Sequence, residues 1–171
     1  MRATRKAAAL GAATALLAGG LLVGTPAAAA PAAACTGDRL SATGAERPDT
    51  THVRFTVVND GPACQLQGFP TVALAGQGSP DHNKPLRVVP QGRARPVLLS
   101  QGGSASTVLT FTPVLGEADG FCASGADPTV APSLVIGVAG TGFQVAPSDG
   151  GQFALCGDTV HATAFASRLV V

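Results

Sequence analysis

The 171-residue chain has no tryptophan and no tyrosine, and its aromatic content consists of seven phenylalanines. Proteins that bind bases or sugars commonly stack them on exposed aromatic rings, so neither class of ligand is expected here. The only methionine is the initiator, which removes the soft thioether ligands that a copper-handling protein needs. These absences argue against nucleic-acid, carbohydrate and copper binding.

Acidic residues are absent from the start of the chain. Three basic residues, Arg2, Arg5 and Lys6, precede an uncharged Ala/Leu/Gly run, and the sequence TPAAAAPAAA follows. A basic segment, an apolar run and small residues at the end are the three parts of a secretory signal peptide. We therefore predict a signal peptide over residues 1–34, a secreted product, and no membrane span once the signal is removed.

The cleavage site has two candidates, after Ala29 or after Ala34, because small residues surround both and a cut directly before Pro31 is disfavoured. The alternative is a lipid-anchored protein with its lipid on Cys35, since Ala33-Ala34-Cys35 resembles the end of a lipobox. The residue before this triplet is alanine where leucine is usual, which favours the secreted form.

Charge is sparse in the remainder of the chain, and Lys84 is its only lysine. The signal contains three of the eleven basic residues, which leaves eight against ten acidic ones and a formal charge of −2. Such a domain has no basic patch to attract phosphate backbones or anionic lipid. We expect a single domain over residues 35–171, long enough for one core, with no nucleic-acid partner.

Four cysteines, Cys35, Cys64, Cys122 and Cys156, all follow the predicted signal. Exported chains meet oxidising conditions, so two disulfides are expected. A zinc site would need closely spaced cysteine pairs, which this chain lacks. Three pairings remain open from sequence. We favour Cys35 with Cys64 and Cys122 with Cys156, which close two loops of about thirty residues and contribute about 3 to 4 kcal/mol each.

The segment His52 to Pro70 has the clearest strand pattern. Val53, Phe55 and Val57 alternate with polar residues, Asn59-Asp60-Gly61-Pro62 follows as a turn sequence, and a short alternating segment begins at Cys64. Period-2 alternation is typical of a half-buried strand. The pattern predicts a β-hairpin whose second strand is held by a disulfide.

Short apolar runs separated by Gly/Pro-rich turns continue through the rest of the chain, without a helical period. This spacing is typical of an antiparallel sandwich. We predict an all-β fold, an immunoglobulin-like antiparallel β-sandwich, with a jelly roll or small β-barrel as the alternative. Further strands are expected over 38–43, 71–75, 86–89, 96–99, 105–111, 134–138 and 160–171, with 113–132 irregular and 140–151 a loop.

Several motifs together resemble a known family. An N-D-G turn is followed by C-Q-L-Q-G-F-P at Cys64 to Pro70, a later G-G-S-A-S-T strand begins at Gly102, and cysteines stand early and late in the chain. This pattern resembles domain of unknown function 4232, found in secreted and lipid-anchored actinobacterial proteins. The resemblance implies an exported, disulfide-bonded, mostly β domain. It implies no catalytic residues.

No motif in the chain predicts chemistry. His52, His82 and His161 lack metal-ligand spacing, and a site built from Asp81 and His82 with a distant histidine has little support. The stretch 102–106 precedes a strand and is interpreted as a turn rather than a nucleophile elbow. Glu117 and Asp119 are interpreted as solvated loop residues rather than calcium ligands. We expect no catalytic residue, no cofactor and no metal.

Two functions remain after these exclusions. The first is a non-catalytic extracellular domain that binds a protein or a cell-envelope component through loops at the end of a rigid sandwich. Loops 76–85 and 116–132 are the candidate contacts. The second is a secreted proteinase inhibitor, whose reactive loop would be the stretch 113–131 around Cys122, stiffened by its disulfide. An enzyme is not expected.

Overall fold

The computed structural model describes residues 31–76, 83–116 and 120–167. The chain divides into two units between Ala30 and Pro31, and every described residue belongs to the second. Most of the predicted signal peptide therefore lies outside the described residues. In the part that is described, no helix is long and apolar enough to cross a membrane.

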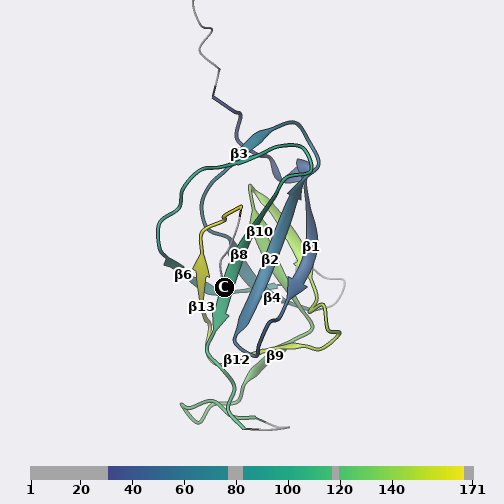
Figure 1. Cartoon of the computed structure of the whole chain (residues 1–171). Coiled ribbons are helices and arrows are strands. Elements are labelled where there is room, and N and C mark those ends of the chain that lie inside the picture. Colours follow the sequence, from purple (N-terminus) through teal and green to yellow (C-terminus); the bar gives the residue numbers. More distant parts are fainter. Residues whose placement is uncertain (1–30, 77–82, 117–119, 168–171) are drawn as a thin grey trace, which may run out of the picture. The chain divides into compact units, whose positions relative to one another are not determined.

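The described residues are all-β apart from one 3-10 turn, η1 (Gly37–Arg39). The strands are β1 (Leu40–Glu46), β2 (His52–Asn59), β3 (Cys64–Leu66), β4 (Thr71–Ala75), β5 (Asn83–Pro85), β6 (Arg87–Gln91), β7 (Val97–Leu99), β8 (Ser104–Phe111), β9 (Thr129–Ala131), β10 (Ser133–Val138), β11 (Thr141–Val145), β12 (Phe153–Leu155) and β13 (Thr159–Thr163) (Figure 1).

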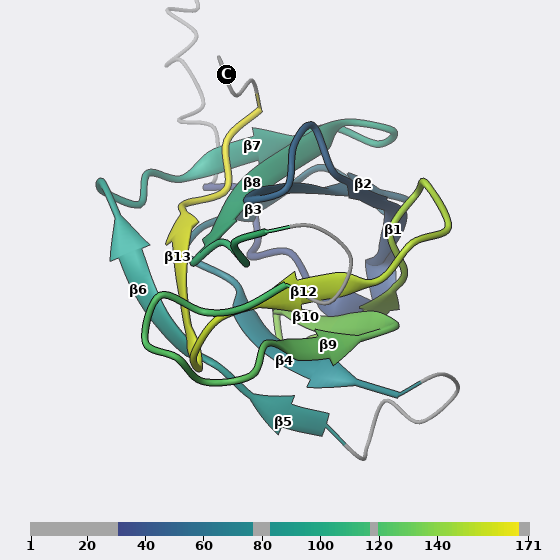
Figure 2. The same ribbon diagram turned by 90° about the horizontal axis from the view of Figure 1, so that it is seen from below.

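These strands form four sheets. One has five strands in the order β1-β2-β8-β13-β6, and a second has four in the order β11-β10-β4-β5 (Figure 2). Two small sheets, β12-β9 and β3-β7, complete the set. All strand pairs are antiparallel except β13 with β6. Within the described residues each sheet has two free edges, so no barrel is closed.

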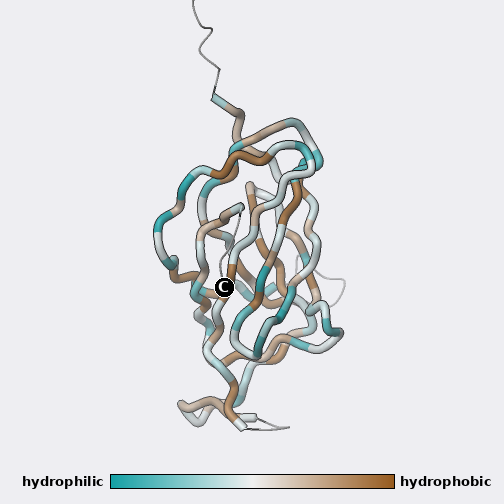
Figure 3. The backbone as a smooth tube through the Cα atoms, viewed as in Figure 1, coloured by the Kyte–Doolittle hydropathy of each residue, from teal (hydrophilic) through white to brown (hydrophobic). Residues whose placement is uncertain are grey.

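The two larger sheets share one hydrophobic core. Phe55 and Leu109 from the five-stranded sheet, and Leu134 and Ile136 from the four-stranded sheet, are fully buried in the same cluster. The ring centroid of Phe55 lies 6.3 Å from that of Phe143 on β11, which joins the two sheets directly. Burying each such side chain contributes about 1.5 to 3 kcal/mol. In Figure 3 the segment between β6 and β7 is largely hydrophilic, whereas brown apolar and teal polar stretches alternate along the long strands.

The predicted hairpin over His52 to Pro70 is wrong, although both of its strands exist. β2 pairs with β1 and β8, whereas β3 pairs with β7 in a separate sheet. The chain leaves β2 at Asn59, and the disulfide from Cys64 to Cys35 fixes β3 beside residues 33–35 rather than beside β2. Alternation showed the strands, but it carried no information on their partners.

Asn59 explains why the chain turns where it does. Its side chain is fully buried, and its Nδ2 donates to the carbonyl oxygens of Pro62 at 2.8 Å and of Leu99 and Ser100 at 3.2 Å each. Its Oδ1 accepts from the Gly61 N–H at 3.0 Å. One amide therefore satisfies backbone groups on two connections, the turn after β2 and the turn before β8.

Two other expectations at the C-terminal end are wrong. Residues 140–151 are not all loop, because β11 returns along β10 after a two-residue turn at Ala139 and Gly140. Both turn residues have positive φ, 49° and 83°, as a tight hairpin turn requires. The expected last strand over 160–171 ends at Thr163, and residues 168–171 lie outside the described part. Strands β9 and β12 were not predicted.

Both disulfides pair as favoured from sequence, Cys35 with Cys64 and Cys122 with Cys156. No cysteine of the described residues is free. A lipid thioether at Cys35 would require the sulfur atom that forms the first disulfide. The structure therefore opposes the lipid-anchored alternative.

Candidate binding surface

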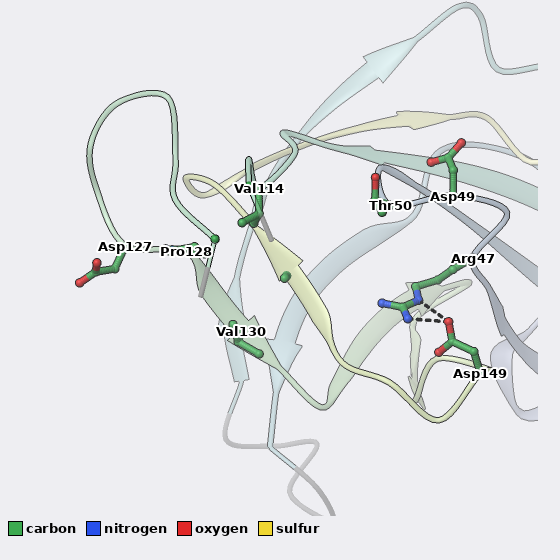
Figure 4. A pocket seen from close by; sticks show the side chains of 11 residues that line it. Arg47, Asp49, Thr50, Val114, Asp127, Pro128, Val130 and Asp149 are labelled. Atoms are coloured by element: carbon green, nitrogen blue, oxygen red, sulfur yellow. Dashed lines mark hydrogen bonds and ion pairs between the residues drawn. The ribbon is translucent and has the colours of Figure 1, made fainter. Parts of the chain in front are cut away.

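A cavity of about 720 Å³ opens among the loops next to the small β9-β12 sheet (Figure 4). Three separate stretches of chain border it: the connection from β1 to β2, the stretch from β8 to β9, and the connection from β11 to β12. Its lining residues are Arg47, Asp49, Thr50, Val114, Gly116, Gly120, Asp127, Pro128, Val130, Asp149 and Ala154.

An ion pair holds one wall of the cavity. The Nε and Nη2 of Arg47 donate to one carboxylate oxygen of Asp149, and its Nη1 donates to the carbonyl oxygen of Gln152. The second Asp149 oxygen accepts from the Gly151 N–H at 2.9 Å. The Arg47 guanidinium and this backbone hydrogen bond hold the pKa of the Asp149 carboxyl below its usual range. The pair cross-links the β1–β2 and β11–β12 connections.

Asp49 organises the β1–β2 connection. Its Oδ1 accepts from the Thr51 N–H at 2.7 Å, the Thr51 hydroxyl at 2.9 Å and the His52 N–H at 2.8 Å. The His52 Nδ1 lies 2.8 Å from the other oxygen. The Thr51 N–H is the largest of the causes that hold the pKa of Asp49 well below its usual range. Asp49 is therefore a charged acceptor that fixes the loop before β2.

Exposed apolar side chains gather beside this cavity. Among the described residues four large apolar side chains are exposed, and three of them are Leu115 (41%), Phe121 (58%) and Val130 (53%). Leu115 and Phe121 exchange two backbone hydrogen bonds of 2.8 Å, and Val130 lines the cavity on β9. The fourth, Leu98, lies on β7 in a different sheet.

The second disulfide anchors this apolar group. Cys122 directly follows Phe121, is buried, and is bonded to Cys156 at the end of β12. The Cys156 N–H also donates to the carbonyl oxygen of Thr112, which ties β12 to the end of β8. The segment that carries Leu115 and Phe121 is thus joined at its base to the core.

A family comparison covers nearly all of this disulfide-bonded β-structure. The model of the family described as Domain of unknown function (DUF4232) matches residues 35–166, which include both disulfides and the cavity. The chain belongs to this family. The comparison with curated proteins and the comparison with solved structures gave no match.

The residues considered from sequence for metal binding or catalysis lie apart in the DUF4232 domain or outside its described part. His52 binds Asp49, and His161 is exposed on β13. Asp81 and His82 lie outside the described residues, as do Glu117 and Asp119. Over the described ranges no three His, Cys, Asp or Glu side chains come together as a metal site would require. The turn predicted over 102–106 is confirmed only at its start, because residues 104–106 already belong to β8.

Of the two candidate loops, the second borders the cavity of the DUF4232 domain, through Gly116, Gly120, Asp127, Pro128 and Val130. The first lies partly outside the described residues, and its last three residues form β5. Sequence reasoning missed Arg47, Asp49 and Asp149 because they come from loops a hundred residues apart. The only signal was the D-T-T turn sequence at Asp49.

Low pH should lower the stability of the DUF4232 domain, partly through protonation of Asp49. Its folded pKa lies below the unfolded one, so its contribution to stability is present above about pH 4 and is lost as the pH falls through the folded pKa. We expect Asp49→Asn to lower the melting temperature at pH 7 and to converge with the wild type towards pH 2. Melting temperatures of both proteins between pH 2 and 7 measure this, with the exposed Asp60→Asn as control. A constant gap over that range would contradict it.

Proposed function

We propose that this chain is a non-catalytic, exported binding domain whose contact surface is the cavity and the apolar side chains beside it. One observation carries the proposal: Leu115 and Phe121 are exposed on a segment that the Cys122–Cys156 disulfide anchors, and Val130 is exposed on β9, which lines the cavity next to it. Monomeric proteins rarely expose grouped large apolar side chains without a binding role. A segment that is held by a disulfide also loses little conformational entropy when it binds a partner.

The polar groups of the cavity support binding rather than catalysis. The carboxylates of Asp49 and Asp149 have lowered pKa values because hydrogen bonds already stabilise their charge. A general acid or base works best with a pKa near the operating pH. Arg47 is committed to Asp149 and to a backbone carbonyl. These groups shape the loops and stay charged at the rim, and the apolar side chains form the centre of the contact surface.

The immunoglobulin-like architecture is part of the proposal. The five-stranded and four-stranded sheets, which share one core, correspond to the two layers of such a sandwich. β12-β9 and β3-β7 are additions at the ends of the layers. In this arrangement the cavity occupies the position where sandwich domains carry their recognition loops.

Export predicts a specific N-terminus. The Gln65 N–H donates to the carbonyl oxygen of Ala33 at 2.7 Å, and the Cys35 N–H donates to the carbonyl oxygen of Gln65 at 3.0 Å. Cleavage after Ala34 would remove the first of these hydrogen bonds, whereas cleavage after Ala29 keeps both. We expect the secreted protein to begin at Ala30 and to carry no lipid. Intact mass before and after reduction measures the start and counts the disulfides, and a start at Cys35 would contradict the expectation.

Site-specific photo-crosslinking tests the binding surface. A benzoylphenylalanine placed at Phe121 retains an exposed aromatic side chain there, and the same residue at exposed Leu98 is the matched control. We expect a discrete adduct in the producing cells from position 121 and none from position 98. Val130→Thr should weaken that adduct. Equal adducts from both positions, or none from 121, would contradict the proposal.

A secreted proteinase inhibitor remains the second candidate, because Phe121 is exposed directly beside a disulfide. An inhibitor that presents phenylalanine should fit the hydrophobic specificity pocket of chymotrypsin and not the acidic pocket of trypsin. Titration of both proteases with the purified protein separates the candidates. Stoichiometric loss of chymotrypsin activity alone would support inhibition, and full retention of both activities would remove it.

A further inference from the structure

We propose that the partner of this surface is a polypeptide segment that combines apolar side chains with lysine or arginine. This inference rests on the binding function proposed above and adds the chemistry of the partner. Its apolar side chains would contact Phe121 and Val130, and its cationic groups would face the carboxylates around the cavity.

The centre of the surface is apolar. Val114, Pro128, Val130 and Ala154 line the cavity, and Phe121 is exposed beside it. Protein interfaces commonly have such an apolar centre within a polar rim. A fully hydrophilic partner would leave these side chains in contact with water, so the partner must supply apolar groups of its own.

The rim is acidic. Asp49, Asp127 and Asp149 line the cavity, and Arg47 is the single basic residue among them. Three hydrogen bonds direct the Arg47 guanidinium to Asp149 and to the Gln152 carbonyl. In Figure 4 the carboxylates of Asp127 and Asp49 point away from this pair. The formal charge of the lining is therefore −2, and the Asp49 carboxylate is bound by Thr51 and His52 of its own loop.

Basic residues stand elsewhere on the same domain. Arg93 and Arg95 are exposed just before β7, and β7 pairs with β3. Figure 1 places β3 and the β9-β12 sheet at opposite ends of the larger sheets. The exposed apolar residue near these arginines, Leu98, thus provides a natural comparison surface with the opposite charge. Electrostatic complementarity directs a cationic partner to the cavity end.

Selection from a random peptide library tests the inference. The full-length chain, exported and with both disulfides formed, selects twelve-residue peptides displayed on phage, and the Phe121→Ser/Val130→Thr double variant removes those that bind elsewhere. Both replaced side chains are exposed, so the variant is expected to fold, which its melting temperature verifies. Leu98→Ser is the matched surface control.

We expect the selected peptides to be rich in apolar residues together with lysine or arginine. Synthetic copies should bind the double variant at least about tenfold more weakly and Asp127→Asn about two- to fivefold more weakly, with no change for Leu98→Ser. Peptides that depend on Phe121 and Val130 but carry acidic residues would overturn the partner class and keep the binding surface. If no peptide distinguishes the wild type from the double variant, both proposals fail.

Discussion

Replacement of Asn59 by alanine should lower the free energy of unfolding by about 3 kcal/mol. The substitution removes the hydrogen bonds that the buried amide makes to the carbonyls of Pro62, Leu99 and Ser100 and to the Gly61 N–H. A buried polar group left without its partner costs about 1 to 3 kcal/mol, and several groups lose theirs at once. Urea unfolding followed by circular dichroism measures the change.

Two further substitutions separate hydrogen bonding from side-chain volume. Asn59→Asp keeps the shape and the acceptor for Gly61 but replaces the donor with a carboxylate that faces carbonyl oxygens, so it should destabilise at neutral pH at least as much as alanine. The neighbouring Asp60 is exposed, and Asp60→Ala should change the free energy by less than about 0.5 kcal/mol. Equal effects at positions 59 and 60 would show that the amide is not the link between the two turns.

Removal of the Cys122–Cys156 disulfide through a double alanine variant should cost about 3 to 4 kcal/mol. The bridge spans a sequence separation of 34, and the chain-entropy model gives this magnitude for a loop of that length. It also anchors the segment that carries Phe121. Relative to the wild type, we therefore expect amide hydrogen exchange to increase more in residues 112–116 and 120–131 than in β2 and β8. The selected peptides should also bind the variant more weakly.

The Cys35–Cys64 pair provides the matched control, because its loop has a sequence separation of 29. Its double alanine variant should lose a similar free energy of unfolding. The loosened region should instead be residues 31–37 and β3, which the first bridge joins. Peptide binding at the cavity end should be unchanged under conditions where the variant stays folded. If both variants weaken binding equally, the second disulfide has no special relation to the surface.

Sequence reasoning predicted the strand content of this chain better than its connections. Phe55 and Leu109 alternate with less buried residues because one face of each strand is buried, so periodicity identified β2 and β8. Pairing depends on contacts between distant residues, and the amide of Asn59 reaches carbonyls forty residues away. No local sequence pattern predicts such a long-range hydrogen bond. β11 was missed because Ala139 adopts a left-handed conformation that sequence assigns to glycine or asparagine.

The disulfides were predictable because the compartment and the even count restrict cysteines to few arrangements. The cavity was less predictable from sequence than the disulfides. One of its loops, 116–132, was named as a candidate contact, but Arg47 and Asp149 meet across a hundred positions. The exposure of Phe121 could not be predicted either, since phenylalanine is usually buried and its neighbours give no sign of orientation.

The parallel pairing of β13 with β6 bears on how the chain would fold during the export proposed above. In the five-stranded sheet β6 has β13 as its one partner, and β13 lies more than seventy residues later in the chain. A chain that crosses a membrane from its N-terminus delivers β13 after every other strand of that sheet. The sheet therefore stays incomplete, and its middle strand β8 keeps an open edge, until translocation is nearly finished. Such late closure favours passage as an unfolded polypeptide and makes β13 the strand that completes the sheet.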